Sequence, residues 1–249
     1  MRLDRFLSEM GISSRSELKK EIRRGQVLLN GEEARDPSLF VDPENPPVVL
    51  YRGREFHYEA FSYYMMNKPA GILSASRDKK QSTVLDLIQE DRRRDLFPVG
   101  RLDKDCEGLL LISNDGPLSH RLLRPKSHVP KLYFVRVSGR LTESDAELFR
   151  RGLRYDEDLT ALPAELTILS AEDIISEACV RITEGKFHQI KKMFLALPKK
   201  KEVLFLKRIA LGPLRLDEAL KPGEYRKLKE AEISALKEIP SSASEEMRR

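Results

Sequence analysis

One loop of the sequence carries charged residues whose types and spacing suit catalysis. The stretch Gly100-Arg101-Leu102-Asp103-Lys104-Asp105 leads into an apolar segment, 109–113. A carboxylate beside cations keeps a low pKa and stays ionised, so Asp103 could serve as a nucleophile or a base. A surface aspartate that caps a turn would show the same residue types, and composition alone favours that alternative.

A second candidate is the segment EGKFHQIKKMF at 184–194. Its spacing predicts a helix over 188–196, with Lys191 and Lys192 less clearly placed than the apolar residues. His188 could take part in chemistry, although a hydrogen-bonded structural histidine is more common. No metal site is predicted, because the four histidines are scattered and Cys106 and Cys179 form no CxxC pattern.

The third candidate is an aromatic residue within the predicted strand PKLYFVRV at 130–137. Alternation along a strand points Tyr133 to one face and Phe134 to the other. Either ring would fit a hydrophobic core. An aromatic side chain in this position could also stack on a nucleobase.

Several classes of protein are disfavoured by the motifs that the chain lacks. No glycine-rich phosphate loop, dinucleotide fingerprint or G-x-S-x-G element occurs, so no nucleotide cofactor is predicted. No apolar run approaches the roughly 20 residues of a membrane span, and no apolar signal core follows Met1, which predicts a cytoplasmic protein. The 249 residues include 45 Lys and Arg against 40 Asp and Glu, and this mildly basic balance suits an anionic partner.

The elements that must position these residues form two blocks and a tail. Residues 1–58 show helical spacing over 3–10, a second helix after Ser13-Ser14, and strands at 26–30 and 48–51, with a turn at Asn30-Gly31. Residues 62–235 mix strands and helices without a regular βαβ repeat. This predicts an α+β fold with a largely antiparallel, mixed sheet flanked by helices and loops. The polar segment 240–249 is predicted to be disordered.

Individual elements of the second block follow from the same patterns. The predicted strands are 63–66, 109–113, 133–137, 178–182 and 203–208. The predicted helices are 82–89, 118–123, 143–151, 188–196 and 231–239.

The first block resembles the S4 RNA-binding domain, a small α/β module, over almost its whole length. The match rests on Arg2-Leu3-Asp4, on Ser13-Ser14-Arg15 and on the Asn30-Gly31 turn. In that family the two helices and the adjoining turn present basic side chains to RNA. The resemblance implies phosphate contacts, which position RNA without reading its sequence, by Arg5, Arg15, Lys19, Lys20, Arg23 and Arg24.

The whole chain resembles the pseudouridine synthases that carry an N-terminal S4 domain, the RsuA family. Four stretches carry the match in order: MNKPAGILSAS (66–76), GRLDKDCEGLLLISNDG (100–116), KLYFVRV (131–137), and EGKFHQIKKMF (184–194) with LKRIALGPLRLDEALKPGEYRKL (206–228). Enzymes of this family isomerise uridine in RNA to pseudouridine without a metal, a redox centre or ATP. The resemblance therefore implies an isomerase that needs no cofactor.

The resemblance also implies a role for each site residue. Asp103 would be the essential carboxylate, acting on the uracil ring, on the ribose C1′, or in proton removal on a glycal route. Tyr133 would stack on the flipped uracil, Lys191 would be the basic partner of Asp103, and Arg101 would help fill the space that the uridine leaves. The other substrate-binding residues implied are Leu102, Lys68, His188 and Gln189.

The segment KFHQIKK at 186–192 is of the type carried by small-subunit rRNA enzymes, which favours 16S rRNA as the partner, with or without bound ribosomal proteins. Two alternatives stay open: the same chemistry on 23S rRNA, and a ribosome assembly factor that only binds RNA. The complete set of Asp103, Tyr133 and Lys191 argues against the assembly factor, because a binder needs no such chemistry. Nothing in the sequence indicates an obligate oligomer, so a monomer is predicted.

Overall fold

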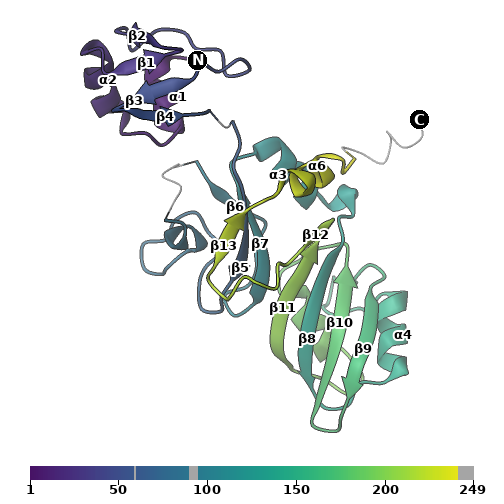
Figure 1. Cartoon of the computed structure of the whole chain (residues 1–249). Helices are drawn as coiled ribbons and strands as arrows, with labels where there is room; N and C mark the ends of the chain where they lie inside the picture. The colour runs from purple at the N-terminus through teal and green to yellow at the C-terminus, as the bar shows by residue number, and fades with distance from the viewer. Residues whose placement is uncertain (59, 90–94, 241–249) are drawn as a thin grey trace. The chain divides into compact units, whose positions relative to one another are not determined.

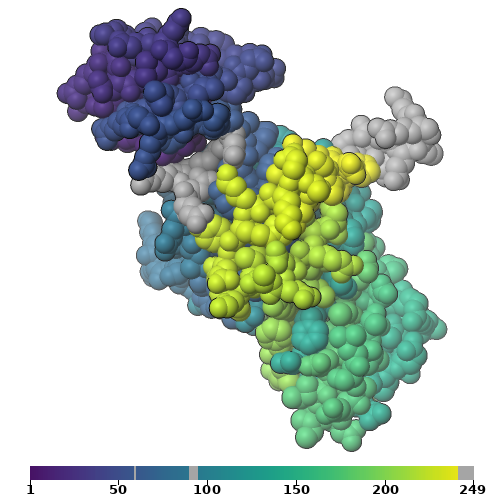
Figure 2. Space-filling model, viewed as in Figure 1, coloured from purple at the N-terminus to yellow at the C-terminus, as the bar shows by residue number. Residues whose placement is uncertain are grey.

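The computed structural model describes residues 1–58, 60–89 and 95–240, and it divides into two compact units (Figure 1, Figure 2). The first consists of Met1–Ser62 with Ile88–Leu96, and the second of Tyr63–Leu87 with the chain from Phe97 onward. The predicted tail at 240–249 lies outside the described residues except for Pro240. No helix in the described ranges is long and apolar enough to cross a membrane.

Two helices and a small antiparallel sheet build the first unit. The helices are α1 (Leu3–Glu9) and α2 (Arg15–Arg23). The described strands lie in the order β2 (Glu32–Ala34), β1 (Val27–Leu29), β3 (Val49–Tyr51) and β4 (Arg54–Phe56). One face of each helix buries apolar side chains in a core that also takes Val27, Val49 and Tyr51 from the sheet. The helices therefore turn their polar faces, which carry the basic residues, to solvent.

Local sequence rules account for the joints of this unit. Ser14 caps α2 as predicted, because its hydroxyl accepts a hydrogen bond from the Glu17 backbone N–H (3.3 Å). The Glu17 carboxylate accepts from the Ser13 hydroxyl (2.6 Å). Asn30 and Gly31 have φ of 51° and 89°, the left-handed conformation that a tight two-residue hairpin requires. The predicted Asn30-Gly31 turn is thus confirmed, and it joins β1 to β2.

The second unit is built on a mixed sheet that contains nine strands in the part of the chain described. The main order is β13 (Tyr225–Lys227), β5 (Tyr63–Lys68), β7 (Glu107–Ser113), β11 (Val203–Leu211), β8 (Lys131–Ser138), β10 (Ile175–Ile182) and β9 (Glu165–Ala171). In addition, β6 (Phe97–Val99) pairs with β7, and β12 (Leu214–Arg215) pairs with β11. Only the β7–β11 pair is parallel among those described, which confirms the predicted largely antiparallel α+β fold.

Helices pack against this sheet and complete its cores. Helix α4 (Glu143–Arg151) lies along β9 (Figure 1), and its Phe149 ring is 5.0 Å from the Phe194 ring of α5 (Gln189–Leu195). Helices α3 (Gly116–Leu123) and α6 (Glu230–Lys237) bury Leu118 and Leu236 in a second cluster with residues of β5 and β7. Strand β7 is buried on both faces, whereas β8 and β11 bury alternate residues, and these three strands frame the site described below.

One predicted helix is wrong. Over 82–89 the chain forms only a 3₁₀ turn, Val84–Leu87. The Asp86 carboxylate accepts hydrogen bonds from the backbone N–H and the hydroxyl of Thr83 (2.7 and 3.1 Å), and the Val84 N–H bonds the Leu73 carbonyl (3.0 Å). These bonds cap the first turn, whose N–H groups have no acceptor within a helix, but within the described range 82–89 no α-helix continues beyond that turn. The other predicted helices and strands are found with shifted ends. Strand β9 and the short strands β2, β4, β6, β12 and β13 were not predicted.

Candidate active site

A pocket in the second unit brings together segments that lie far apart in the sequence. The loop before β7 contributes Arg101, Leu102, Asp103 and Cys106. Strand β8 contributes Tyr133, and the segment that leads into α5 contributes 185–186 and 188–191. Ile182 and Leu206 add apolar wall. All the residues predicted for catalysis and substrate binding line this pocket, with the exception of Lys68.

Asp103 lies near two basic side chains without a close contact to either. His188 Nε2 is 3.5 Å from one carboxylate oxygen, and Lys191 Nζ is 3.9 Å from the other. The side chain of Asp103 is 26% exposed, so its oxygens face the pocket. No hydrogen bond from the described residues engages this carboxylate. It is therefore available to a substrate as a nucleophile or a base.

Lys191 is shared between two carboxylates. Its Nζ bonds both oxygens of Asp105 at 2.6 Å, which is closer than its 3.9 Å approach to Asp103. These hydrogen bonds from Lys191 lower the pKa of Asp105, and they outweigh the opposite effect of its partial burial. The predicted pairing of Lys191 with Asp103 is thus the longer of two contacts, because Asp105 is the nearer partner.

Lys68 does not line the pocket, and its predicted substrate-binding role stays a prediction. The side chain is fully buried at the end of β5. Its Nζ lies within hydrogen-bonding distance of four carbonyl oxygens, those of Pro69 (3.0 Å), Asp103 (3.2 Å), Lys104 (3.2 Å) and Cys106 (2.9 Å). Burial lowers the pKa of Lys68, while these carbonyls satisfy its N–H groups. Lys68 therefore anchors the backbone of the loop that carries Asp103.

Other contacts fix the same loop. The Ser74 hydroxyl donates to the Leu102 carbonyl (2.9 Å) and accepts from the Leu102 N–H (3.1 Å). Gly108 follows the loop with φ of 101°, and a Cβ there would lie 2.2 Å from the backbone oxygen of Arg208. Only glycine allows β7 and β11 to approach so closely. The backbone around Asp103 is thus held firmly, whereas its carboxylate is left free.

Tyr133 sits beneath the pocket opposite a buried arginine. The tyrosine is 7% exposed, and its cross-strand neighbour on β11 is Arg208, which is 3% exposed. Arg208 Nε donates to the Leu109 carbonyl (2.7 Å), and its Nη2 has no hydrogen-bond partner among the described residues. Burial raises the pKa of Tyr133, and the positive charge of Arg208 acts in the opposite direction. Tyr133 thus offers the pocket a neutral aromatic ring.

Gln189 orders the segment that carries His188. Its side-chain oxygen accepts from the Lys186 N–H (3.1 Å), and its Nε2 donates to the Glu184 carboxylate (2.8 Å). Gln189 is also buried, and its hydrogen bonds support the segment around it, while its predicted contact with substrate stays a prediction. His188 begins α5 in the left-handed region, with φ of 52°, and its ring remains at the pocket wall.

A buried carboxylate organises the basic surface of the first unit. The Asp4 side chain is inaccessible to solvent, and its oxygens lie 3.2 Å from Arg2 Nε, 3.1 Å from Arg15 Nε and 3.6 Å from Lys19 Nζ. Burial alone would raise the pKa of Asp4, but hydrogen bonds from Arg15 and Arg2 lower it to about 2. Asp4 therefore holds part of the predicted RNA-binding surface in a fixed arrangement.

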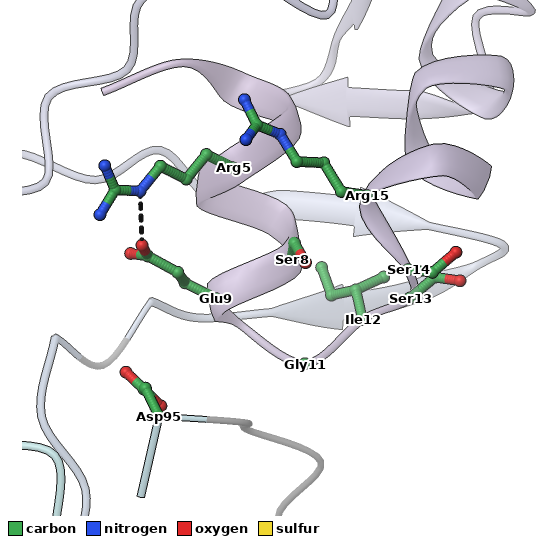
Figure 3. A pocket seen from close by; sticks show the side chains of 9 residues that line it. All are labelled: Arg5, Ser8, Glu9, Gly11, Ile12, Ser13, Ser14, Arg15 and Asp95. Carbon is green, nitrogen blue, oxygen red and sulfur yellow. Dashed lines mark hydrogen bonds and ion pairs between the residues drawn. The ribbon is translucent and has the colours of Figure 1, made fainter.

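The predicted RNA contacts differ in how far they are already paired. Those with a carboxylate partner are Arg5, Arg15, Lys19 and Arg24. Figure 3 shows the pair between Arg5 and Glu9, whose closest atoms are 2.7 Å apart. Lys20 and Arg23 are exposed on α2 and form no ion pair with any described residue. These two are the more available contacts for an added phosphate.

Comparisons with known proteins assign the class that this fold and pocket define. A family model described as RNA pseudouridylate synthase matches residues 62–196, and an S4 domain model matches residues 1–45. The chain therefore belongs to the RNA pseudouridine synthases, as an S4-bearing member of the RsuA family. It is an isomerase that forms pseudouridine in RNA, which confirms the predicted class of enzyme.

Individual relatives match almost from end to end. The chain is 44% identical over 239 residues to the uncharacterized RNA pseudouridine synthase YtzG of Bacillus subtilis, which covers 96% of this chain and 99% of that protein. It is 38% identical over 238 residues to the ribosomal small subunit pseudouridine synthase A of Vibrio vulnificus, with coverage of 95% and 99%. A crystal structure of a pseudouridylate synthase is similar with a TM-score of 0.65 and 33% identity, over 95% of this chain and 99% of that one.

Two neighbours of the predicted residues were not anticipated. Asp105 is two positions from Asp103, and its negative charge beside Lys104 was visible in the sequence, but its capture of Lys191 depends on how α5 packs. Arg208 lies 75 residues from Tyr133 along the chain and meets it only through the β8–β11 register. A basic residue at a core position of a predicted strand was the one available clue.

Proposed function

We propose that this enzyme converts a uridine of 16S rRNA to pseudouridine in the pocket at Asp103. The observation that carries this proposal is that Asp103, Tyr133 and Lys191 line one pocket although they come from three separate segments. The 16S target is supported by relatives at 35–38% identity whose names specify the small ribosomal subunit. The segment KFHQIKK at 186–192 supports the same target.

The uridine would enter this pocket as a flipped nucleotide. A base inside a stack does not expose its glycosidic bond, so the nucleotide must leave the stack at a cost of a few kcal/mol. The Tyr133 ring would offset part of that cost, since a stack between a base and an aromatic ring contributes about 1–3 kcal/mol. Arg101, which is exposed and lines the pocket, would occupy the gap in the RNA.

Asp103 would carry the chemistry. The N1–C1′ bond breaks, the uracil turns over, and a bond forms between C5 and C1′. The C5 proton leaves and N1 gains a proton, so the reaction balances without a cofactor. Asp103 would act by attack on the ring or on C1′, or by taking a ribose proton on a glycal route. Tyr133, packed against the flipped base, would lie near the C5 proton.

The first unit would hold the RNA through its phosphates. The cationic side chains of α1 and α2 supply attraction that positions RNA without reading sequence. Specificity would then come from the shape of the RNA and from contacts at the pocket rim. The substrate would be cytoplasmic rRNA, bare or with bound ribosomal proteins, and the enzyme would act as a monomer.

Mapping of pseudouridine by carbodiimide treatment and primer extension tests this proposal. Unmodified 16S and 23S transcripts and ribosomal precursors would be incubated with the wild type and with Asp103→Asn. The expected result is one new stop in 16S rRNA that the wild type makes and the variant does not. Asp173→Asn is the matched control, because Asp173 is 89% exposed and lies outside the pocket.

Each other outcome has a separate meaning. A stop in 23S rRNA that depends on Asp103 would keep the site and overturn the 16S target. A stop made equally by Asp103→Asn would overturn the assignment of Asp103. Binding of RNA by the wild type without any stop would support the assembly-factor alternative.

A further inference from the structure

One large aromatic side chain beside the active site is left in solvent. Phe187 is 70% exposed, whereas Phe149 and Phe194 of the same unit are fully buried. Its sequence neighbours Lys186 and His188 both line the pocket at Asp103. An exposed phenylalanine forfeits the hydrophobic stabilisation of burial, so its place at the rim of a functional pocket calls for an explanation.

The segment around Phe187 is held in place. Lys186 Nζ forms an ion pair with Glu184 (2.8 Å), and Gln189 bonds both Lys186 and Glu184 from the other side. The backbone of His188 adopts φ of 52°, a conformation that residues other than glycine seldom adopt and that clusters at functional sites. The exposure of Phe187 is therefore a product of a defined loop geometry.

The Phe187 ring is stacked on the ring of His188, which itself contacts Asp103. Its centroid is 3.8 Å from that of His188, and the two ring planes differ by 19°. The edge of His188 points to Asp103, since Nε2 is 3.5 Å from a carboxylate oxygen. His188 thus covers one face of Phe187, and the high exposure of Phe187 leaves its other face open at a fixed distance from Asp103.

We propose that the open face of Phe187 stacks on a nucleobase next to the target uridine and continues the stack formed with His188. This inference rests on the proposed function, which places the flipped uridine at Asp103. Aromatic faces are the usual partners of unstacked bases in RNA recognition. Arg101 is exposed at the same pocket and forms no ion pair with a described residue, which favours an anionic ligand over an apolar one, whereas Lys186 and Lys191 are already paired with Glu184 and Asp105. Phe187 is thereby a residue that selects the RNA around the uridine and takes no part in the bond changes.

Replacement of Phe187 tests the proposal through binding, which is independent of turnover. Dissociation constants would be measured for Phe187→Ala, Phe187→Leu and Phe187→Trp on whichever full-length transcript, 16S or 23S, the wild type binds more tightly. Loss of one base–aromatic stack predicts about 10-fold weaker binding for Ala and Leu, and Trp should bind at least as tightly as wild type. Ile174→Ala is the matched control, because Ile174 is 81% exposed and does not line the pocket.

Two results would overturn the proposal. Unchanged dissociation constants for Ala and Leu would mean that the ring does not contact RNA. Wild-type binding by Leu, together with a loss in Ala that His188→Ala reproduces, would mean that Phe187 only supports His188. The Asp103→Asn variant separates this test from the proposed function: if it still forms pseudouridine, the assignment of Asp103 fails, while the binding data decide the role of Phe187.

Discussion

The two units of this enzyme treat a carboxylate beside cations in opposite ways. In the first unit, Asp4 is inaccessible to solvent and receives close contacts from Arg2 and Arg15. In the second unit, Asp103 is 26% exposed, and its nearest cationic atoms, on His188 and Lys191, are 3.5 and 3.9 Å away. Similar residue types therefore produce a carboxylate with close cationic partners in the first unit and a carboxylate with only distant ones in the second.

This difference separates a structural charge from one that is available for chemistry. A buried carboxylate is tolerated only when ion pairs and hydrogen bonds compensate the loss of water. Asp4 meets that condition and has no capacity left for a ligand. Around Asp103, by contrast, the side chains of Lys68 and Ser74 form hydrogen bonds with the loop backbone and hold the loop in place. A rigid loop with a free carboxylate is the arrangement that positions a reactive group.

The largest effect on stability is expected from Asp4→Asn. The substitution leaves Arg2, Arg15 and Lys19 without their shared partner, and because these cations are about half exposed, the expected loss of stability is about 1–2 kcal/mol. Hydrogen exchange of peptides from residues 1–58 would report this loss, while protection of the catalytic sheet stays unchanged. Glu44→Gln, an exposed carboxylate of the same unit, serves as the control. Equal exchange in Asp4→Asn and wild type would show that the cluster has no stabilising role.

The same contrast extends to pH. The pKa of Asp4 is lowered from an ordinary value of 3.8 to about 2 in the folded protein, so the unfolded chain takes up the proton more readily. The stability that Asp4 contributes is thus present above about pH 4 and is lost as the pH falls toward 2. Acid unfolding curves of wild type and Asp4→Asn should differ at neutral pH and converge near pH 2. A difference in unfolding free energy between the two proteins that does not change from neutral pH to pH 2 would contradict this link between pKa and stability.

A smaller effect is expected from the shared lysine. Lys191→Met should reduce the rate of pseudouridine formation about 10- to 100-fold. This loss corresponds to a free energy between those measured when exposed and when buried ion pairs are broken. Asp105→Asn should change the rate less than about fivefold, because it frees Lys191 to approach Asp103. Single-turnover assays on both variants would compare these values. A loss in Asp105→Asn as large as that in Lys191→Met would mean that Lys191 acts through Asp105.

The smallest effect concerns RNA binding by the first unit. The double variant Lys20→Gln/Arg23→Gln should make the negative slope of the logarithm of the RNA association constant against the logarithm of salt concentration shallower by about 1.4. Each phosphate contact on single-stranded RNA contributes about 0.7 to that slope. Arg5→Gln/Arg24→Gln should change the slope less, because Glu9 and Glu21 already pair with those arginines. Titrations at several salt concentrations would measure the slopes. Equal slopes for the two double variants would remove the distinction between paired and unpaired cations.

Local sequence rules predicted the helix cap and the tight turn, and the order of the motifs along the chain predicted which residues line the pocket. The Ser14 cap and the Asn30-Gly31 turn depend on neighbours within a few residues, so the sequence contains their cause. Of the helix predicted over 82–89, only a first 3₁₀ turn forms, and Asp86 caps it through the Thr83 N–H. The spacing of apolar residues does not show where such a turn ends.

Side-chain roles within the site depend on packing that no local pattern specifies. The charge of Lys68 suited a contact with substrate. The structure instead buries its side chain at the end of β5, where its Nζ donates to backbone carbonyls that include that of Asp103. Arg208 reaches Tyr133 through a parallel pairing of β11 with β7 and an antiparallel pairing with β8. Such a juxtaposition requires the strand order, which the spacing of apolar residues does not contain.

The proposed role of Asp103 is chemical, whereas Asp4 is a structural carboxylate, and one experiment separates the two roles. Single-turnover formation of pseudouridine at saturating enzyme, together with the thermal unfolding midpoint, would be measured for Asp103→Asn and Asp4→Asn on the transcript that the wild type modifies. The predicted result is at least a roughly 10³-fold slower reaction for Asp103→Asn with an unchanged midpoint, and a lowered midpoint for Asp4→Asn with a near-normal rate. Pseudouridine formation by Asp103→Asn at close to the wild-type rate would contradict the proposed role of Asp103.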